Sequence, residues 1–136
     1  MRIVFDTNVL FSAFTVHGAC AGLYEECLQW ARIVVSVEIL AELEEKLAAK
    51  TKSSAAEIRE VLDAIREDAE IVEAISLPER VCRDADDDMV LAAAISARAD
   101  AIVTGDHDLL ILQEVQGIPI LNPRDCLARL SDTRDE

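Results

Sequence analysis

Residues 1–8 read MRIVFDTN and contain the first predicted strand, from which the fold can be built outward. Its run RIVF (residues 2–5) is short, rich in Ile and Val and bounded by polar residues, which is typical of a strand covered on both faces of a sheet. Asp6 follows the run directly, and residues 9–11 form a second short apolar run after Asp6, Thr7 and Asn8. Comparable runs predict about five strands in all, and the other four lie at residues 32–35 (RIVV), 70–74 (EIVEA), 101–104 (AIVT) and 118–121 (IPIL). The run EIVEA carries charges and is the weakest of the five.

Helical patterns separate the strands. Apolar side chains recur at helical spacing in most of them, residues 89–97 are rich in Ala, and Asn122 and Pro123 suit the start of the last helix. The predicted helices span residues 19–30, 37–47, 55–65, 89–97, 109–115 and 123–130. This alternation predicts a three-layer α/β/α fold with a mostly parallel central sheet. We expect a single domain over residues 1–130 and a polar C-terminal tail over residues 131–136.

Composition narrows the class of protein. A chain of 136 residues that is 51% hydrophobic can bury a real core without disulfides. No apolar run reaches the length of a membrane-spanning helix and no signal peptide is evident, so we expect a cytoplasmic protein without membrane contact. The cysteines show no metal-finger spacing and are predicted to be free thiols; they are Cys20, Cys27, Cys82 and Cys126.

The formal net charge of −14 counts against a nucleic-acid binder, because phosphate contacts normally require a basic face. Two explanations remain open. Either the ligand is not a nucleic acid, or some of the acids gather where divalent cations neutralise them and bridge to phosphate. An acidic surface can also simply keep a protein soluble.

Acidic residues follow the predicted strands. Asp6 comes directly after the first strand and Asp106 after the fourth, while Glu42 lies near the second turn of the helix after the second strand. In open parallel sheets ligands bind outside the carboxyl ends of the strands, so these acids should converge. The Ala-rich helix is preceded by four further candidates, Asp84, Asp86, Asp87 and Asp88. Crowded carboxylates repel one another unless a cation is present, and Mg²⁺ and Mn²⁺ prefer oxygen ligands.

Each candidate also has a purely local explanation. Asp6 can be a helix N-cap, and the acids before the Ala-rich helix can interact with its dipole. Glu42 lies among other glutamates on what could be a solvated helix face. Asn8 and Thr104 could orient a carboxylate or make local backbone bonds. Singly the local explanation is favoured, whereas the joint pattern favours a metal site.

Taken together, four segments resemble the PIN-domain family of nucleases. MRIVFDTNVLFSAF looks like the family's first strand and DTNVL motif, and VSVEILAELEEKL like the segment with its helical Glu. DADDDMVLAAAISARADAIVTGDHDLL is similar to the third acidic segment, Ala-rich helix and T-x-D strand end, and GIPILNPRDCLARL to the closing strand and helix. The resemblance covers nearly the whole chain. It is closest to the subgroup described as toxin components of type II toxin–antitoxin systems.

The resemblance implies an endoribonuclease that needs Mg²⁺ or Mn²⁺ and leaves a 5′-phosphate and a 3′-hydroxyl. The metal site would be Asp6, Glu42, Asp87 and Asp106, with Glu42 coordinating or helping to deprotonate the water. Asp88 is the alternative to Asp87. The supporting residues would be Asn8, Asp84, Asp88, Thr104 and Asp108. Implied partners are an RNA substrate, an antitoxin protein and a second copy in a homodimer.

Two rival functions remain open. A phosphatase of the haloacid-dehalogenase type also places an Asp after the first strand, but it needs a DxD pair where this chain has Asn8, and a later lysine where none follows Lys52. A non-catalytic protein-binding module could instead use its acidic face to dock a basic partner. Such a module would bind its partner without cleaving RNA.

Overall fold

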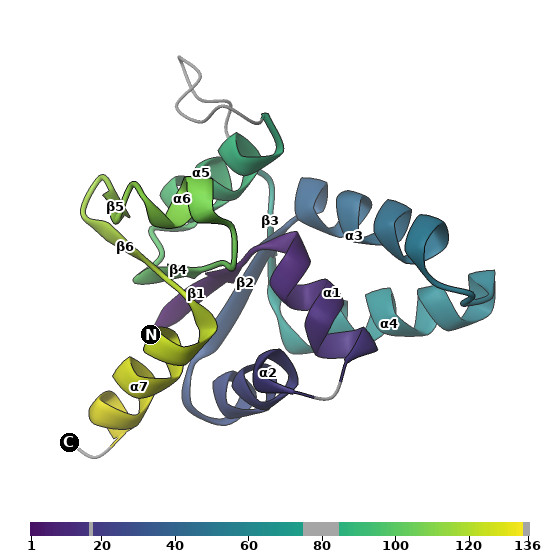
Figure 1. The fold of residues 1–136 in the computed structure, drawn as a ribbon, viewed down its shortest axis with the longest axis horizontal. Coiled ribbons are helices and arrows are strands. Elements are labelled where there is room, and N and C mark those ends of the chain that lie inside the picture. Colours follow the sequence, from purple (N-terminus) through teal and green to yellow (C-terminus); the bar gives the residue numbers. More distant parts are fainter. Residues whose placement is uncertain (17, 75–84, 135–136) are drawn as a thin grey trace.

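The computed structural model describes residues 1–16, 18–74 and 85–134 (Figure 1). A six-stranded sheet forms its centre, in the order β3-β2-β1-β4-β6-β5. All neighbouring pairs are parallel except β5 and β6, which are antiparallel. The strands are β1 (Arg2–Phe5), β2 (Arg32–Ser36), β3 (Glu70–Val72), β4 (Ala101–Val103), β5 (Glu114–Val115) and β6 (Ile118–Leu121). The α/β fold and the mostly parallel sheet confirm the prediction.

The helices cover both faces of the sheet. They are α1 (Thr7–Thr15), α2 (Ala19–Trp30), α3 (Val37–Lys50), α4 (Ala55–Asp68), α5 (Ala85–Ala97), α6 (His107–Leu110) and α7 (Pro123–Arg134). Helix α2 packs on α1 and α7, whereas α5 packs on β1, β2 and β4. Parallel crossovers are right-handed, so connections that run in opposite directions along the sheet place their helices on opposite faces. Helices α1, α2, α3 and α4 therefore lie on one face, and α5 lies on the other. This gives the three layers.

The strand order reverses between β1 and β4. The chain leaves β1 toward β2 and β3 on one side, and returns to β4, β6 and β5 on the other. At such a reversal the loops after the two central strands diverge and leave a crevice at their carboxyl ends, where ligands of open α/β sheets bind. The residues that follow β1 and β4 are Asp6 and Thr104, with Asp106 two positions further on.

The Ala-rich segment forms the part of α5 that packs against the sheet. Ala93 and Ala94 of α5 are fully buried, and their small side chains let this helix lie close to the sheet. On the other face the ring of Phe5 meets Tyr24 edge-on, with 5.9 Å between centroids. The Tyr24 hydroxyl donates to Asp68 Oδ2 at 3.0 Å, which ties α2 to the end of α4. The carboxyl end of β1 is therefore held between α5 on one face and α2 on the other.

Several boundaries differ from those predicted. Helix α1 was not expected, and Val9 and Leu10, read as an apolar run, are its buried residues. The helix expected over residues 109–115 was wrong, since α6 ends at Leu110 and residues 114–115 form β5. Backbone conformations with positive φ at Gln113, Gln116 and Gly117 break that pattern. Helix α5 begins at Ala85 rather than at residue 89, and α7 continues to Arg134.

The described cysteines form no disulfide. Cys20, Cys27 and Cys126 are free thiols, whereas Cys82 lies outside the described residues. Among the described helices none is both long enough and apolar enough to cross a membrane.

Candidate active site

Asp6 lies at the carboxyl end of β1 and caps helix α1. Its Oδ1 accepts a hydrogen bond from the Asn8 amide at 3.2 Å, and its side chain is buried, with only 5% of the residue exposed. Burial raises the pKa of Asp6 above its usual value, and the charge of Asp106 adds to this rise. Hydrogen bonds from Thr104 and Asn8 and the charge of Lys46 act in the opposite direction. Asp6 is therefore a buried acid in an environment that disfavours its ionised form.

Thr104 connects Asp6 to Asp106. The residue is fully buried, and its Oγ1 donates to Asp6 Oδ2 at 2.5 Å. The same oxygen accepts a hydrogen bond from the Asp106 amide at 3.0 Å. One hydroxyl thus joins the ends of β1 and β4 across the point where the strand order reverses. This contact brings together, at one edge of the sheet, two polar residues that lie 98 positions apart in sequence.

A compact group of carboxylates lies next to this link. Asp87, Asp106 and Asp108, hereafter the aspartate cluster, each place one carboxylate oxygen within 4.8 Å of the other two. Asp87 is buried on the first part of α5, Asp106 caps α6, and Asp108 is exposed. Asp106 Oδ1 accepts a hydrogen bond from the Asp108 amide at 2.8 Å, which fixes their relative positions. Three converging carboxylate oxygens are a donor set suited to a hard divalent cation.

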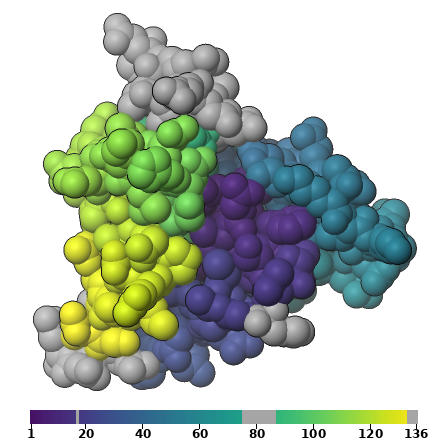
Figure 2. All heavy atoms as spheres, in the orientation of Figure 1, coloured from purple at the N-terminus to yellow at the C-terminus, as the bar shows by residue number. Residues whose placement is uncertain are grey.

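A lysine brings Glu42 to the site. Lys46 Nζ lies 3.2 Å from Glu42 Oε1, one helical turn earlier on α3, and donates to Asn8 Oδ1 at 2.5 Å. Its charge also lowers the pKa of Asp6. Lys46 was missed in the sequence, where only its spacing of four residues from Glu42 could have indicated it. In Figure 2 the N-terminal segment (purple) lies between the segment near residue 110 (green) and α3 (blue) at the surface.

The nine candidate residues therefore divide into groups. Asp87 and Asp106 meet as expected, but the third member of the cluster is Asp108, which the resemblance had given only a supporting role. Asp6 contacts the cluster through Thr104, and Glu42 reaches Asn8 through Lys46. Asp88 is half-buried on α5 and is not a member of the cluster, and Asp84 lies outside the described residues.

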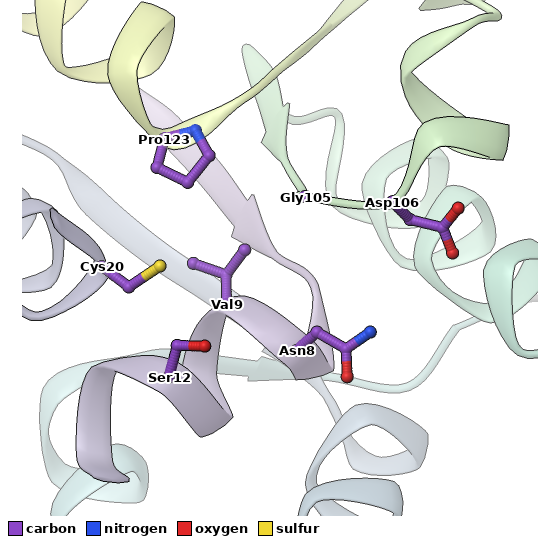
Figure 3. A pocket seen from close by; sticks show the side chains of 7 residues that line it. All are labelled: Asn8, Val9, Ser12, Cys20, Gly105, Asp106 and Pro123. Carbon is purple, nitrogen blue, oxygen red and sulfur yellow. The ribbon is translucent and has the colours of Figure 1, made fainter. Parts of the chain in front are cut away.

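A pocket of about 210 Å³ opens beside Asp106 (Figure 3). Asp106 and Asn8 line the side nearest to the carboxylates, and α1, the start of α2 and the start of α7 form the rest. Its lining residues are Asn8, Val9, Ser12, Cys20, Gly105, Asp106 and Pro123. The pocket and the aspartate cluster have Asp106 in common.

Solved structures with similar folds come from several organisms. VapBC2 from Rickettsia felis, bound to a DNA fragment from its promoter, matches with a TM-score of 0.66 and 18% identity, over 90% of this chain and 98% of that chain. VapBC-1 from nontypeable Haemophilus influenzae matches with a TM-score of 0.64 and 14% identity, over 91% and 99%. A protein from Pyrobaculum aerophilum matches with a TM-score of 0.62 and 18% identity, over 97% and 90%. At these identities the likeness concerns the fold.

Sequence comparison gives the family. No curated protein gives a significant match to the chain. The sequence model of the PIN domain family does match, over residues 2–108, which include Asp6, Glu42 and the whole aspartate cluster. Since the match covers most of the chain and ends just after the carboxylates at the strand ends, the chain belongs to the PIN domain family.

Proposed function

We propose that the protein is an endoribonuclease that hydrolyses RNA phosphodiester bonds at an acidic site loaded with Mg²⁺ or Mn²⁺. The observation that carries the proposal is the aspartate cluster, which lies at the strand-order reversal, next to Asp6. Membership of the PIN domain family supports nuclease chemistry. The resemblance of the sequence to toxin components supports RNA as the substrate.

The donor set fits such a metal. Asp87, Asp106 and Asp108 would hold it, and their carboxylates offer the oxygen ligands that Mg²⁺ and Mn²⁺ prefer. Asp6 is linked to this group through Thr104, and Glu42 is linked to Asn8 through Lys46. When bound, the metal would lower the pKa of a water molecule and offset the charge of the scissile phosphate. It would also relieve the repulsion among the clustered carboxylates, which adds to the burial that raises the pKa of Asp6.

The surrounding residues hold these acids in place. Thr104 Oγ1 and the Asn8 amide restrict both oxygens of Asp6, so this carboxylate enters the reaction already oriented. Lys46 places a positive charge between Glu42 and Asn8. We propose that Lys46 attracts the phosphate to an otherwise acidic site, and that Glu42 takes a proton from the attacking water.

The decisive experiment is cleavage of end-labelled single-stranded and structured RNA with Mg²⁺, Mn²⁺ or a chelator. We expect Asp6→Asn and Asp106→Asn to reduce cleavage at least 100-fold, a loss comparable to that of other essential electrostatic groups, on the order of 3 kcal/mol. Asp125→Asn removes the same charge from an exposed residue of α7 and is the matched control. Metal-dependent cleavage that survives both active-site substitutions would point to a contaminating nuclease and refute the site.

We further propose that the protein is the toxin of a toxin–antitoxin pair. Its resemblance to that subgroup and its fold likeness to VapBC proteins support this role. Expression should then arrest bacterial growth in the parent and not in Asp6→Asn. The net charge of −14 favours a basic antitoxin segment as partner. If a basic partner binds but neither parent nor variant cleaves RNA, the non-catalytic binding module is the better description.

A further inference from the structure

We infer that the pocket beside Asp106 binds one base of the RNA strand, next to the phosphate that the carboxylates cut. This inference rests on the proposed nuclease function and adds a substrate contact to it. Asp106 belongs to both the aspartate cluster and the pocket lining. A group in the pocket would therefore lie near a phosphate held at the cluster, and in a nucleic acid the group attached to that phosphate is a nucleoside.

The lining residues suit a base of the RNA better than a phosphate of its backbone. Asp106 is the one charged residue of the lining, and it is negative, so a second phosphate would be repelled. Pro123 is half-buried and supplies apolar surface against which a flat ring can lie, while Ser12 and Asn8 supply polar groups. Recognition of single-stranded RNA commonly combines such contacts with an unstacked base.

Among the described residues, none accepts a hydrogen bond from the side-chain amide nitrogen of Asn8. Asn8 Oδ1 accepts from Lys46 at 2.5 Å, so the amide nitrogen remains to donate to a ring nitrogen or carbonyl of a base. In Figure 3 this nitrogen lies on the side of Asn8 that faces Asp106. With a volume of about 210 Å³ the pocket lies below the usual range of sites for larger ligands, roughly 300 Å³ and above, which agrees with a single base.

Gly105 offers a way to close the pocket without disturbing the fold. A Cβ at Gly105 would meet no atom within 4 Å, and its backbone conformation is open to other residues. Gly105→Leu should therefore fill part of the pocket at little cost in stability. Gly22 also has open space around it but lies on α2 and does not line the pocket, so Gly22→Leu is the matched control.

The first test uses RNA oligomers of one sequence, each lacking one base at a different position. Loss of the base at one fixed position relative to the cut should lower cleavage roughly 10- to 100-fold, the range expected from base stacking. Gly105→Leu should lower cleavage of intact RNA by a similar factor. On the oligomer that lacks that base, Gly105→Leu and the parent should cleave at nearly the same rate. The inference would be overturned if all oligomers were cleaved equally fast. It would also be overturned if Gly105→Leu lowered cleavage by the same factor on the intact RNA and on the RNA that lacks the base.

A second test does not depend on cleavage. Cys20 lines the pocket and is partly exposed, whereas Cys27 and Cys126 are buried. In a Cys82→Ser background an intact oligomer should slow alkylation of Cys20 by iodoacetamide. An oligomer that lacks the critical base should not slow it, and neither should an oligomer that has no bases at all. Protection without cleavage would refute the nuclease proposal but keep the pocket. Cleavage without protection would refute the pocket alone.

Discussion

Replacement of Thr104 by valine should destabilise the protein because it removes the hydroxyl that links the two central strand ends. Valine keeps the shape of the buried side chain but leaves Asp6 Oδ2 without its donor and the Asp106 amide without its acceptor. A hydrogen bond to a charged group contributes about 1.5–3 kcal/mol, and a neutral one about 1 kcal/mol. The free energy of unfolding should therefore fall by about 2–4 kcal/mol at neutral pH. For a domain of this size that corresponds to roughly 8–16 °C in Tm.

The loss should depend on pH in a defined direction. The Thr104 hydrogen bond lowers the pKa of Asp6, so its removal raises the folded-state pKa further above the ordinary Asp value of 3.8. A raised folded-state pKa gives stability that is present below the unfolded pKa and lost as the pH rises through the folded value. The deficit of Thr104→Val should therefore be largest at neutral pH and shrink as the pH falls toward 3.8.

Urea unfolding from pH 7 down to pH 4 with excess chelator measures this prediction, and Thr104→Ser is the control. Serine keeps the hydroxyl and loses one buried methyl group, which should cost about 1 kcal/mol at every pH. The difference between the valine and serine variants isolates the hydroxyl. If the two variants unfold alike, or if their difference is constant with pH, the link through Thr104 does not act on Asp6 as argued.

Three further predictions concern the site and its support. Mn²⁺ should raise the Tm of the parent, and Asp87→Asn should remove most of that rise in a thermal shift assay, because Asp87 belongs to the aspartate cluster; an unchanged rise would place the metal elsewhere. Lys46→Gln should tighten Mn²⁺ binding in calorimetry about 2- to 5-fold while slowing cleavage, since it removes a cation from beside Asp6; weaker Mn²⁺ binding would contradict this. Ser54→Ala should lower the free energy of unfolding by about 1 kcal/mol, because Ser54 and Glu57 form a capping box at the start of α4; a variant as stable as the parent in urea would contradict it.

The elements that the sequence predicted well are those fixed by local pattern. The Ile/Val runs at residues 2–5 and 118–121 became strands with the expected bounds, because both are short, apolar and flanked by polar residues. Helix α1 was missed because its buried face is short and follows a strand without a break, so Val9 and Leu10 looked like a second apolar run. Strand β5 was missed because its two residues are held by pairing with β6, a contact that no local pattern encodes.

The site was predictable to a similar degree. Strand ends place Asp6 and Asp106, since the carboxyl ends of neighbouring parallel strands meet at one edge. Asp108 could not be distinguished from a simple helix-start residue, because its part in the cluster depends on how α5 brings Asp87 toward α6. Lys46 escaped notice because its contact with Asn8 depends on the packing of α3 against α1, which the sequence spacing does not reveal.

The local and functional explanations of the strand-end acids turn out to be compatible. Asp6 and Asp106 each cap a helix through Oδ1, which accepts the amide two residues further on. A capping hydrogen bond fixes the side-chain rotamer and so aims the other oxygen, which in Asp6 faces Thr104. The cap therefore supplies the orientation that a metal ligand needs. Because the side chain of Asp is short enough to reach its own helix start and that of Glu is too long, Glu at either position would lose both the cap and the direction of the carboxylate.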